Sequence, residues 1–288
     1  MEKNTHMEAL FNPTAVAIIG ASRDETKVGG SFIKSLMSNG FKGAYYAVNP
    51  NETDIMDLKA YSSVLDIPGE VDLVVITIPA PAIPGVMVEC ARKQVKAAII
   101  FSAGFREAGA EGRELEKKVL EAARQGDVRI IGPNCMGVYN PEKGLNTIAA
   151  HIDTPREGGH ISFIGQSGWA SENFIVAGTD RGLRLSKVVS CGNQADLSVT
   201  DYLRYLGDDP ETKFIGAYIE GIPNGKRFFL EAQKVSIRKP VVIWKAGSTG
   251  AGARAVASHT ASMAGTDALW DWQAPMLYGT LHSIKRAL

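Results

Sequence analysis

Short, continuous apolar runs recur along this chain, each followed by a glycine-bearing or polar turn and then a helical segment. This rhythm constrains the fold more than any other feature. In the first half the apolar runs occupy residues 15–19, 44–48, 73–78, 97–101 and 128–131, and the helical segments 31–39, 86–94 and 111–124. Runs of Val and Ile without polar alternation indicate strands buried on both faces, as in a parallel sheet covered by helices. The first half therefore predicts a doubly wound α/β domain.

The same rhythm restarts in the second half. Apolar runs at 161–164, 185–190, 214–219 and 241–244 alternate with helical segments near 170–177, 197–206 and 225–235, which predicts another open parallel sheet. Asp196 is a good N-cap for the helix that begins at residue 197. Residues 140–159 are rich in proline and glycine and indicate a linker. We therefore expect two domains, residues 1–145 and 146–288.

The composition argues against several classes of protein. Of the 288 residues, 45% are hydrophobic and 22% charged, as in a globular protein of two ordinary domains. The formal net charge is zero, so neither nucleic acid nor an anionic membrane is an expected partner. No apolar run reaches the roughly 18 residues of a membrane span, and the N-terminus has no signal-peptide pattern. Cys90, Cys135 and Cys191 fit neither a disulfide framework nor a zinc site, so we expect no metal and a reducing, cytoplasmic setting.

The ends of the strands carry most of the chemical information, because ligands of open α/β sheets bind beyond the carboxyl ends of the strands. The first strand ends in a glycine-bearing loop, residues 20–30, which opens a helix. Backbone N–H groups at such a helix start can bind phosphate, and Lys27 can add charge. However, the dinucleotide fingerprint G-x-G-x-x-G is absent, and the second strand ends in Asn49 and Pro50 where an acidic residue would hold a ribose diol. A nicotinamide dehydrogenase is therefore disfavoured.

Three later strand ends carry distinctive turns: Ile-Pro-Ala-Pro at 78–81, Ser-Ala-Gly-Phe-Arg-Glu at 102–107, and Gly-Pro-Asn-Cys-Met-Gly at 132–137. Each alone could be only a tight connection between elements. Cys135 has two interpretations, a reactive thiol with a lowered pKa or a small residue packed in a tight turn. Because nothing in the sequence indicates a lowered pKa, we favour the structural interpretation.

The most informative segment of the second half surrounds His259. A run of glycine, alanine and other small residues, 245–254, follows the last strand and leads into Ala-Ser-His-Thr-Ala at 257–261. An imidazole nitrogen is both a competent nucleophile for phosphoryl transfer and a good leaving group. Because a side chain on such a loop can visit two sites, we predict that His259 carries a phosphoryl group.

A phosphohistidine needs neighbours of two kinds. Glu220 follows the strand at 214–219 and could fix the tautomer of the imidazole, although a strand-end carboxylate can also be an ordinary polar group. Ser167 and Gly168 lie between a strand and a helix, where a hydroxyl, an amide and the helix dipole can receive a phosphoryl group. We expect all of these at the sheet edge that carries the His259 loop.

Taken together and in this order, the turns of the first half resemble the CoA-binding domain shared by succinyl-CoA synthetase α subunits and NDP-forming acyl-CoA synthetases. The turn at 132–137 is the most specific of them. The run SHT-x-x-x-AG around His259 resembles the phosphohistidine loop of the ADP-forming branch, and so do residues 192–196, 208–213 and 220–222. The resemblance extends from about residue 11 to residue 267. It implies a Rossmann-like CoA-binding domain followed by a flavodoxin-like domain of the succinyl-CoA-synthetase type.

The resemblance also implies a role for individual residues. The CoA nucleotide would lie on the loop after the first strand, and the CoA thiol would lie near Asn134. The expected CoA-binding residues are Gly20, Ala21, Ser22, Lys27, Gly29, Asn49, Pro50, Pro79 and Asn134. His259 would be phosphorylated and stabilised by Glu220, while Ser167 and Gly168 would contact the phosphate.

The implied reaction is that of an acid–thiol ligase, in which a small carboxylic acid, CoA and a nucleoside triphosphate yield acyl-CoA, nucleoside diphosphate and phosphate. Such ligases bind ATP or GTP and Mg²⁺ on an ATP-grasp module, and no segment here resembles one. We therefore expect a β-type subunit or a fused domain as partner, in a hetero- or homo-oligomer. Two departures from the family pattern are Trp169, where a small residue is usual, and the poorly matching residues 268–288.

An alternative function stays open at this stage. The chain could be a non-catalytic CoA-binding sensor or scaffold, which the missing nucleotide module and Trp169 would both fit. The presence of His259 and Glu220 favours the ligase.

Overall fold

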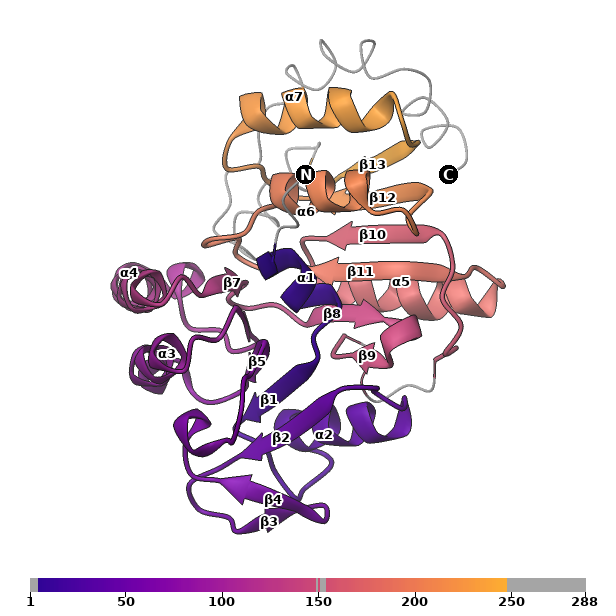
Figure 1. Cartoon of the computed structure of the whole chain (residues 1–288). Coiled ribbons are helices and arrows are strands. Elements are labelled where there is room, and N and C mark those ends of the chain that lie inside the picture. The colour runs from indigo at the N-terminus through magenta and orange to yellow at the C-terminus, as the bar shows by residue number, and fades with distance from the viewer. Residues whose placement is uncertain (1–4, 149, 151–153, 248–288) are drawn as a thin grey trace.

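The computed structural model describes residues 5–148, 150 and 154–247, so His259 and the loop expected around it lie outside the described residues. The described part contains two sheets, each packed against helices, and the second lies beyond the first along the length of the molecule (Figure 1). Within it, no helix is long and apolar enough to cross a membrane.

The first sheet has the strand order β3-β4-β2-β1-β5-β6-β7. Its strands are β1 (Ala15–Ile19), β2 (Ala44–Val48), β3 (Asp54–Ile55), β4 (Leu58–Tyr61), β5 (Leu73–Ile76), β6 (Ala97–Ile100) and β7 (Arg129–Ile131). All pairs are parallel except the β3–β4 hairpin at one edge. β2 lies on one side of β1, and β5, which comes later in the chain, lies on the other side. The order of the strands therefore reverses at β1, and open α/β sheets bind ligands at such a reversal.

Helices cover both faces of the first sheet. They are α1 (Thr5–Phe11), α2 (Val28–Ser38), α3 (Ile83–Arg92) and α4 (Ala110–Gln125), with short 3-10 turns at η1 (Val64–Asp66), η2 (Ala80–Ala82) and η3 (Arg106–Ala108). Alternate residues of β1 point to opposite faces. Ile18 packs into the cluster that includes Phe32 of α2, whereas Ile19 packs into the cluster that includes Ile83 of α3. The predicted doubly wound architecture is confirmed.

The second sheet has the strand order β13-β12-β10-β11-β8-β9. Its strands are β8 (Gly137–Asn140), β9 (Leu145–Asn146), β10 (Ile161–Gly165), β11 (Leu185–Ser190), β12 (Phe214–Ile219) and β13 (Val241–Lys245). The last four are parallel, with β10 between β11 and β12. α5 (Gly168–Asp180) packs on one face, and α6 (Val199–Asp208) and α7 (Gly225–Ser236) pack on the other. The expected second parallel sheet is therefore confirmed as the core of a mixed sheet.

Part of the expected linker is a strand pair instead. β8 runs antiparallel to β11, β9 runs antiparallel to β8, and the 3-10 turn η4 (Pro141–Lys143) connects them. The linker prediction is therefore wrong for residues 140–146, because proline and glycine mark tight turns between strands as well as linkers. The pair belongs to the second sheet although all of its residues except Asn146 precede the predicted boundary, and the division into domains at that boundary stays a prediction.

The start of α6 differs from the prediction as well. Ser198 is its N-cap, and the Ser198 and Asp201 side chains form a reciprocal capping box. Asp196 is not the cap. Its carboxylate instead accepts hydrogen bonds from the Arg129 guanidinium at 2.8 and 2.9 Å and from the Ile130 N–H at 2.8 Å. A sequence cannot reveal that a cap candidate has a stronger cationic partner in another sheet.

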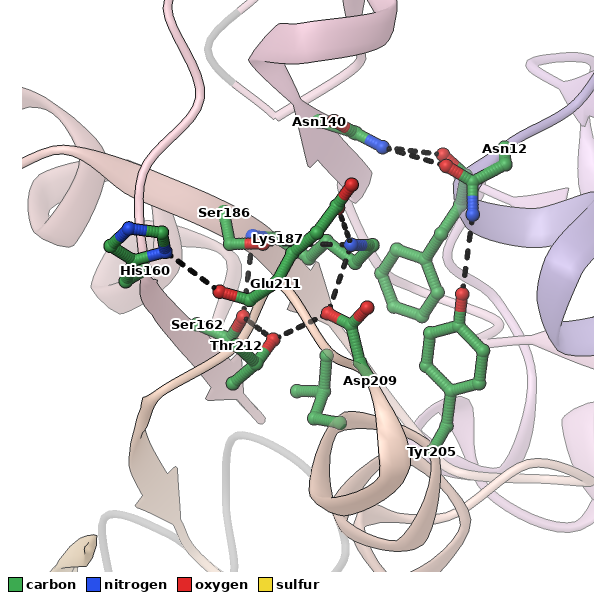
Figure 2. Close-up of polar contacts among 12 residues, drawn as sticks. Asn12, Asn140, His160, Ser162, Ser186, Lys187, Tyr205, Asp209, Glu211 and Thr212 are labelled. Atoms are coloured by element: carbon green, nitrogen blue, oxygen red, sulfur yellow. Dashed lines mark hydrogen bonds and ion pairs between the residues drawn. The ribbon is translucent and has the colours of Figure 1, made fainter. Parts of the chain in front are cut away.

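The N-terminal helix α1 joins the two halves and was not predicted. It contacts both β6 of the first sheet and β8 of the second. The Phe11 ring stacks on the Tyr205 ring of α6 with centroids 5.1 Å apart. Asn12 donates to the Tyr205 hydroxyl at 3.3 Å, and the Asn140 amide donates to Asn12 at 3.2 Å (Figure 2). Residues at the very start of the described chain thus pack against the second half.

A buried lysine lies next to this junction. The Lys187 ammonium, whose side chain is 1% exposed, lies 2.9 Å from an Asp209 carboxylate oxygen and 2.6 Å from one of Glu211 (Figure 2). Thr212 donates to the same Asp209 oxygen at 2.6 Å. Burial lowers the pKa of Lys187, but the hydrogen bonds to Glu211 and Asp209 outweigh that effect, and the net pKa is raised. The group is therefore a charged, paired part of the core.

Replacing Lys187 by Met should lower the free energy of unfolding by about 3 kcal/mol, because it leaves the buried Asp209 carboxylate without its cation. Urea unfolding followed by circular dichroism measures the change. Lys234→Met is a matched control, because Lys234 is 68% exposed and Arg204 lies at the same distance from its partner Glu231, 3.6 Å. Lys234→Met should lower the free energy of unfolding by less than about 1 kcal/mol. Equal losses in the two variants would contradict the assigned role of Lys187.

Candidate functional site

The carboxyl edge of the first sheet brings several predicted CoA-binding residues together. Gly20 and Ala21 directly follow β1, and both of their N–H groups point to the carbonyl of Val48 at the end of β2, at 3.0 and 3.3 Å. The Asn49 amide donates to the Ala21 carbonyl at 2.8 Å. The turn after β1 and the corner after β2 are therefore one rigid unit.

Close packing explains one glycine of this loop. A Cβ atom on Gly29, in the first turn of α2, would lie 2.0 Å from the Gly20 carbonyl oxygen. Lys27 is the N-cap residue, and no side chain caps the helix. The first N–H groups of an α-helix lack partners inside the helix and attract anions. With the exposed side chain of Lys27 beside it, this start can receive a phosphate group.

A row of hydrogen bonds continues along the same edge. Thr77, after β5, donates from its hydroxyl to the carbonyl of Gly20 at 3.2 Å. Ser102, after β6, donates to the carbonyl of Ile78 at 2.5 Å, and the Asn134 N–H donates to the Ser102 carbonyl at 3.1 Å. The turns after β1, β5, β6 and β7 therefore form a continuous surface from Gly20 to Asn134. Ser22 is half-buried, and Pro50 and Pro79 are exposed along it.

The two sheets meet at Asn134. Backbone N–H groups of Asn193 and Ala195, after β11, donate to the carbonyls of Pro133 and Gly132, both at 2.9 Å. Gly192 has a φ of +54°, and a Cβ atom there would lie 2.3 Å from the Pro133 oxygen. The approach of the two backbones thus requires glycine at position 192.

A side-chain contact strengthens this junction. The Glu107 carboxylate accepts hydrogen bonds from the N–H groups of Gly104 and Phe105, at 2.7 and 3.1 Å, and from the Asn193 amide. Burial raises the pKa of Glu107, but these hydrogen bonds outweigh it, and the net pKa is lowered. The carboxylate therefore holds a first-sheet loop to a second-sheet loop. Neither Glu107 nor Asn193 is among the site residues that the sequence predicts.

A pocket of about 300 Å³ opens at the junction. Its lining combines Asn134, from the expected thiol end of the CoA site, with Ser167 and Gly168, from the expected phosphate site. The other lining residues are Phe101, Ala103, Cys135, Met136, Gln166, Trp169 and Gly192. Two predicted sites that are separated in the sequence are thus adjacent in space.

Ser167 and Gly168 have the predicted local geometry. Ser167 is the N-cap of α5, and its hydroxyl accepts from the Ala170 N–H at 3.4 Å. Gly168 is the first residue of the helix, so its N–H is among those without an intrahelical partner. Trp169 follows them at the rim of the pocket. Its indole is 73% exposed and so does not fill the site.

Glu220 directly follows β12, beside the turn after β10. It is 3% exposed. The Gln166 side-chain oxygen accepts from the N–H groups of Glu220 and Gly221, at 2.8 and 2.9 Å. Burial and the neighbouring Glu220 carboxylate both raise the pKa of the Tyr218 hydroxyl. The structure therefore places Glu220 next to the Ser167–Gly168 turn, whereas its predicted partner His259 lies outside the described residues.

The structural interpretation of Cys135 agrees with its surroundings. The thiol is buried, it lies 3.5 Å from the Ile100 carbonyl oxygen, and burial raises its pKa to about 12. A thiol with this pKa is protonated at neutral pH and is not a nucleophile. Within the described residues, no group of three or more His, Cys, Asp or Glu side chains could hold a metal ion.

Comparison with known families agrees with this two-part site. Residues 14–141 match the model of a CoA binding domain, and residues 158–274 match that of a succinyl-CoA ligase like flavodoxin domain. The fold and the site together thus define a CoA-binding unit joined to a unit of the succinyl-CoA-ligase type. The turns after β1 and β7 fall in the first match, and Ser167 and Glu220 fall in the second.

Individual relatives are more specific. The chain is 44% identical over 264 residues to acetate–CoA ligase [ADP-forming] I of Archaeoglobus fulgidus, covering 90% of this chain and 37% of that protein. It is 42% identical over 260 residues to acetate–CoA ligase [ADP-forming] II subunit alpha of Pyrococcus furiosus, covering 90% of this chain and 56% of that subunit. Over about 90% of its length the chain is thus similar to ADP-forming acetate–CoA ligases, and it combines a match to a CoA binding domain with a match to a succinyl-CoA ligase like flavodoxin domain.

A solved structure shows the same similarity. The dinucleotide forming acetyl-coenzyme A synthetase 1 of Ca. Korarchaeum cryptofilum, in complex with phosphate and ADP, matches with a TM-score of 0.87 and 38% identity. The match covers 96% of this chain and 59% of that one. The present chain therefore spans between about a third and three fifths of the length of these relatives.

The Glu107 contact makes the junction sensitive to pH. Because its pKa is lowered from the usual value of about 4.3, ionised Glu107 stabilises the fold above that value, and this stabilisation is lost as the pH falls through the folded-state pKa. Glu107→Gln should therefore be less stable than wild type at pH 7, with a difference that shrinks below about pH 4. Thermal unfolding across this range measures it. Glu121→Gln, an exposed change on α4, is the control, and a Glu107 effect that is independent of pH would contradict the assignment.

Proposed function

We propose that this chain is the CoA-binding, phosphohistidine-carrying portion of an NDP-forming acyl-CoA synthetase. The observation that carries the proposal is the shared pocket, in which Asn134 of the CoA-binding edge faces the turn of Ser167 and Gly168. A thioester and a phosphate must meet for this chemistry, and the pocket lies where the two corresponding surfaces join.

CoA would bind along the carboxyl edge of the first sheet. Its nucleotide phosphates would lie at the uncapped start of α2 near Lys27, and Gly20, Ala21, Ser22, Gly29, Asn49, Pro50 and Pro79 would form the surrounding surface. The row of turns leads from there to Asn134. The thiol end would thus reach the junction pocket and approach the Ser167–Gly168 turn.

The chemistry proceeds in two transfers on this chain. A phosphate oxygen attacks the thioester carbonyl of acyl-CoA, the carbon–sulfur bond breaks, and CoA leaves as the thiolate, which takes up the proton lost by the phosphate, giving an acyl phosphate and CoA thiol. An imidazole nitrogen of His259 then attacks phosphorus, and the carboxylate leaves with the electron pair of the phosphorus–oxygen bond. Ser167, Gly168 and the dipole of α5 would hold the phosphoryl oxygens, because such transfers depend mainly on positioning and electrostatics. Glu220 would stabilise the phosphohistidine by fixing the imidazole.

A partner module completes the cycle. It would be an ATP-grasp subunit or a fused domain, on which Mg²⁺ would neutralise the phosphate charge of ATP or GTP. His259 would hand its phosphoryl group to the nucleoside diphosphate there, and in the reverse direction a small carboxylic acid would be activated. Cys90, Cys135 and Cys191 are all free and buried, which fits a reducing cytoplasm.

Radioactive labelling tests this proposal on the chain itself. Incubation with acetyl-CoA and ³²P-phosphate should give a protein-bound label that is labile to acid and stable to base, and the label should vanish in His259→Asn. His160→Asn is the control, because His160 is exposed and its ring nitrogen lies 3.0 Å from the backbone carbonyl oxygen of Glu211 (Figure 2).

Two outcomes would contradict the proposal. A label that persists in His259→Asn would remove the phosphoryl carrier. CoA binding by calorimetry without any label, also when a nucleotide-binding partner and labelled ATP are supplied, would identify the chain as a CoA-binding sensor or scaffold instead.

A further inference from the structure

Three side chains from the ends of three different strands converge on the backbone of Glu220 and Gly221. The Gln166 side-chain oxygen, after β10, accepts from both of their N–H groups. The Gln194 amide, after β11, donates to the Gly221 carbonyl at 3.2 Å. The Lys245 ammonium, at the end of β13, donates to the Glu220 carbonyl at 3.0 Å. The main chain that carries the Glu220 side chain is thus held from the ends of β10, β11 and β13.

Gln166 is the centre of this arrangement. It is 2% exposed, and its own N–H donates to the Tyr218 carbonyl at 3.0 Å. It therefore makes three hydrogen bonds to the end of β12 while it immediately precedes Ser167 in the turn at the start of α5. Buried hydrogen bonds of this kind restrict rotation of both partners, because breaking them leaves unsatisfied polar groups.

We propose that Gln166 is a positioning residue, which sets the Glu220 carboxylate relative to the anion site of Ser167 and Gly168. The inference rests on the proposed function and assigns Gln166 no contact with the reacting atoms. The Gln166 oxygen accepts from the N–H groups of both Glu220 and Gly221, and so fixes the backbone on both sides of the Glu220 Cα atom. The direction in which the Glu220 side chain leaves the backbone is therefore fixed as well. A displacement of about 1 Å in a catalytic group can cost about 100-fold in rate.

The chemistry of the glutamine explains why this residue type suits the position. A carboxylate could accept the same two hydrogen bonds, but it would add a second negative charge beside Glu220 and close to an incoming phosphate. A neutral amide oxygen holds the turn without that repulsion. Gln166→Glu therefore separates charge from geometry, whereas Gln166→Met removes the acceptor and retains the length of the side chain.

The rate of labelling in a single turnover, with acetyl-CoA and ³²P-phosphate, measures the effect. Gln166→Met should slow labelling about 10- to 100-fold, while the Kd for CoA stays within about twofold because the residues proposed to bind CoA all lie between Gly20 and Asn134. Gln166→Glu should also label slowly at pH 8 and recover as the pH falls, because protonation removes the added charge. Gln233→Met, the same change on α7, should label like wild type.

The possible outcomes are distinct. Absence of label in wild type refutes the proposed function itself. If wild type is labelled, labelling of Gln166→Met at the wild-type rate overturns the role of Gln166 alone. Parallel losses of CoA affinity and labelling would reveal a general structural role and overturn it as well. Should Gln166→Met fail to fold, Gln166→Glu decides, since wild-type labelling by that variant at every pH contradicts the proposal.

Discussion

The candidate site depends on one backbone contact between the two sheets. The N–H groups of Asn193 and Ala195 bind the carbonyls of Pro133 and Gly132, and the close approach of Gly192 to Pro133 lets the two turns lie flat against each other. Because main-chain atoms make this contact, it requires a particular residue type only at Gly192. The contact holds together the two turns beside the junction pocket.

The core around the junction reinforces the contact. A single apolar cluster runs from Ile18 and Ile99 of the first sheet through Cys135 to Val189 and Ile219 of the second. The helix α1 adds a second connection, because it packs against β6 and β8 at once. Close-packed interiors transmit displacement rather than absorb it. The two halves are therefore a common frame for the site rather than two independent modules joined by a linker.

The sequence predicted the fold well wherever strands are buried on both faces. The central strands of both sheets were located to within two residues at each end, because continuous Val and Ile runs leave little else for those segments to form. The predictions failed at the margins. The β8–β9 pair lies in a segment whose proline and glycine residues predict a linker, although the same residues also form tight turns between strands. Asp196 was assigned to a helix cap because its partner, Arg129, is 67 residues away. The site residues themselves stay predictions, with His259 outside the described structure.

The sequence by itself determined the class of fold, the resemblance to a family and the types of residue at the strand ends, because these follow from local periodicity and from short motifs. Only the tertiary structure decided which strand ends are neighbours. It brought Asn134 to Ser167 and Gly168, and it made Gln166 and Gln194 the holders of the turn after β12. Glutamines give no signal in a sequence, because an amide becomes informative only when burial and the geometry of a specific partner fix its hydrogen bonds. That information resides in contacts between segments far apart along the chain.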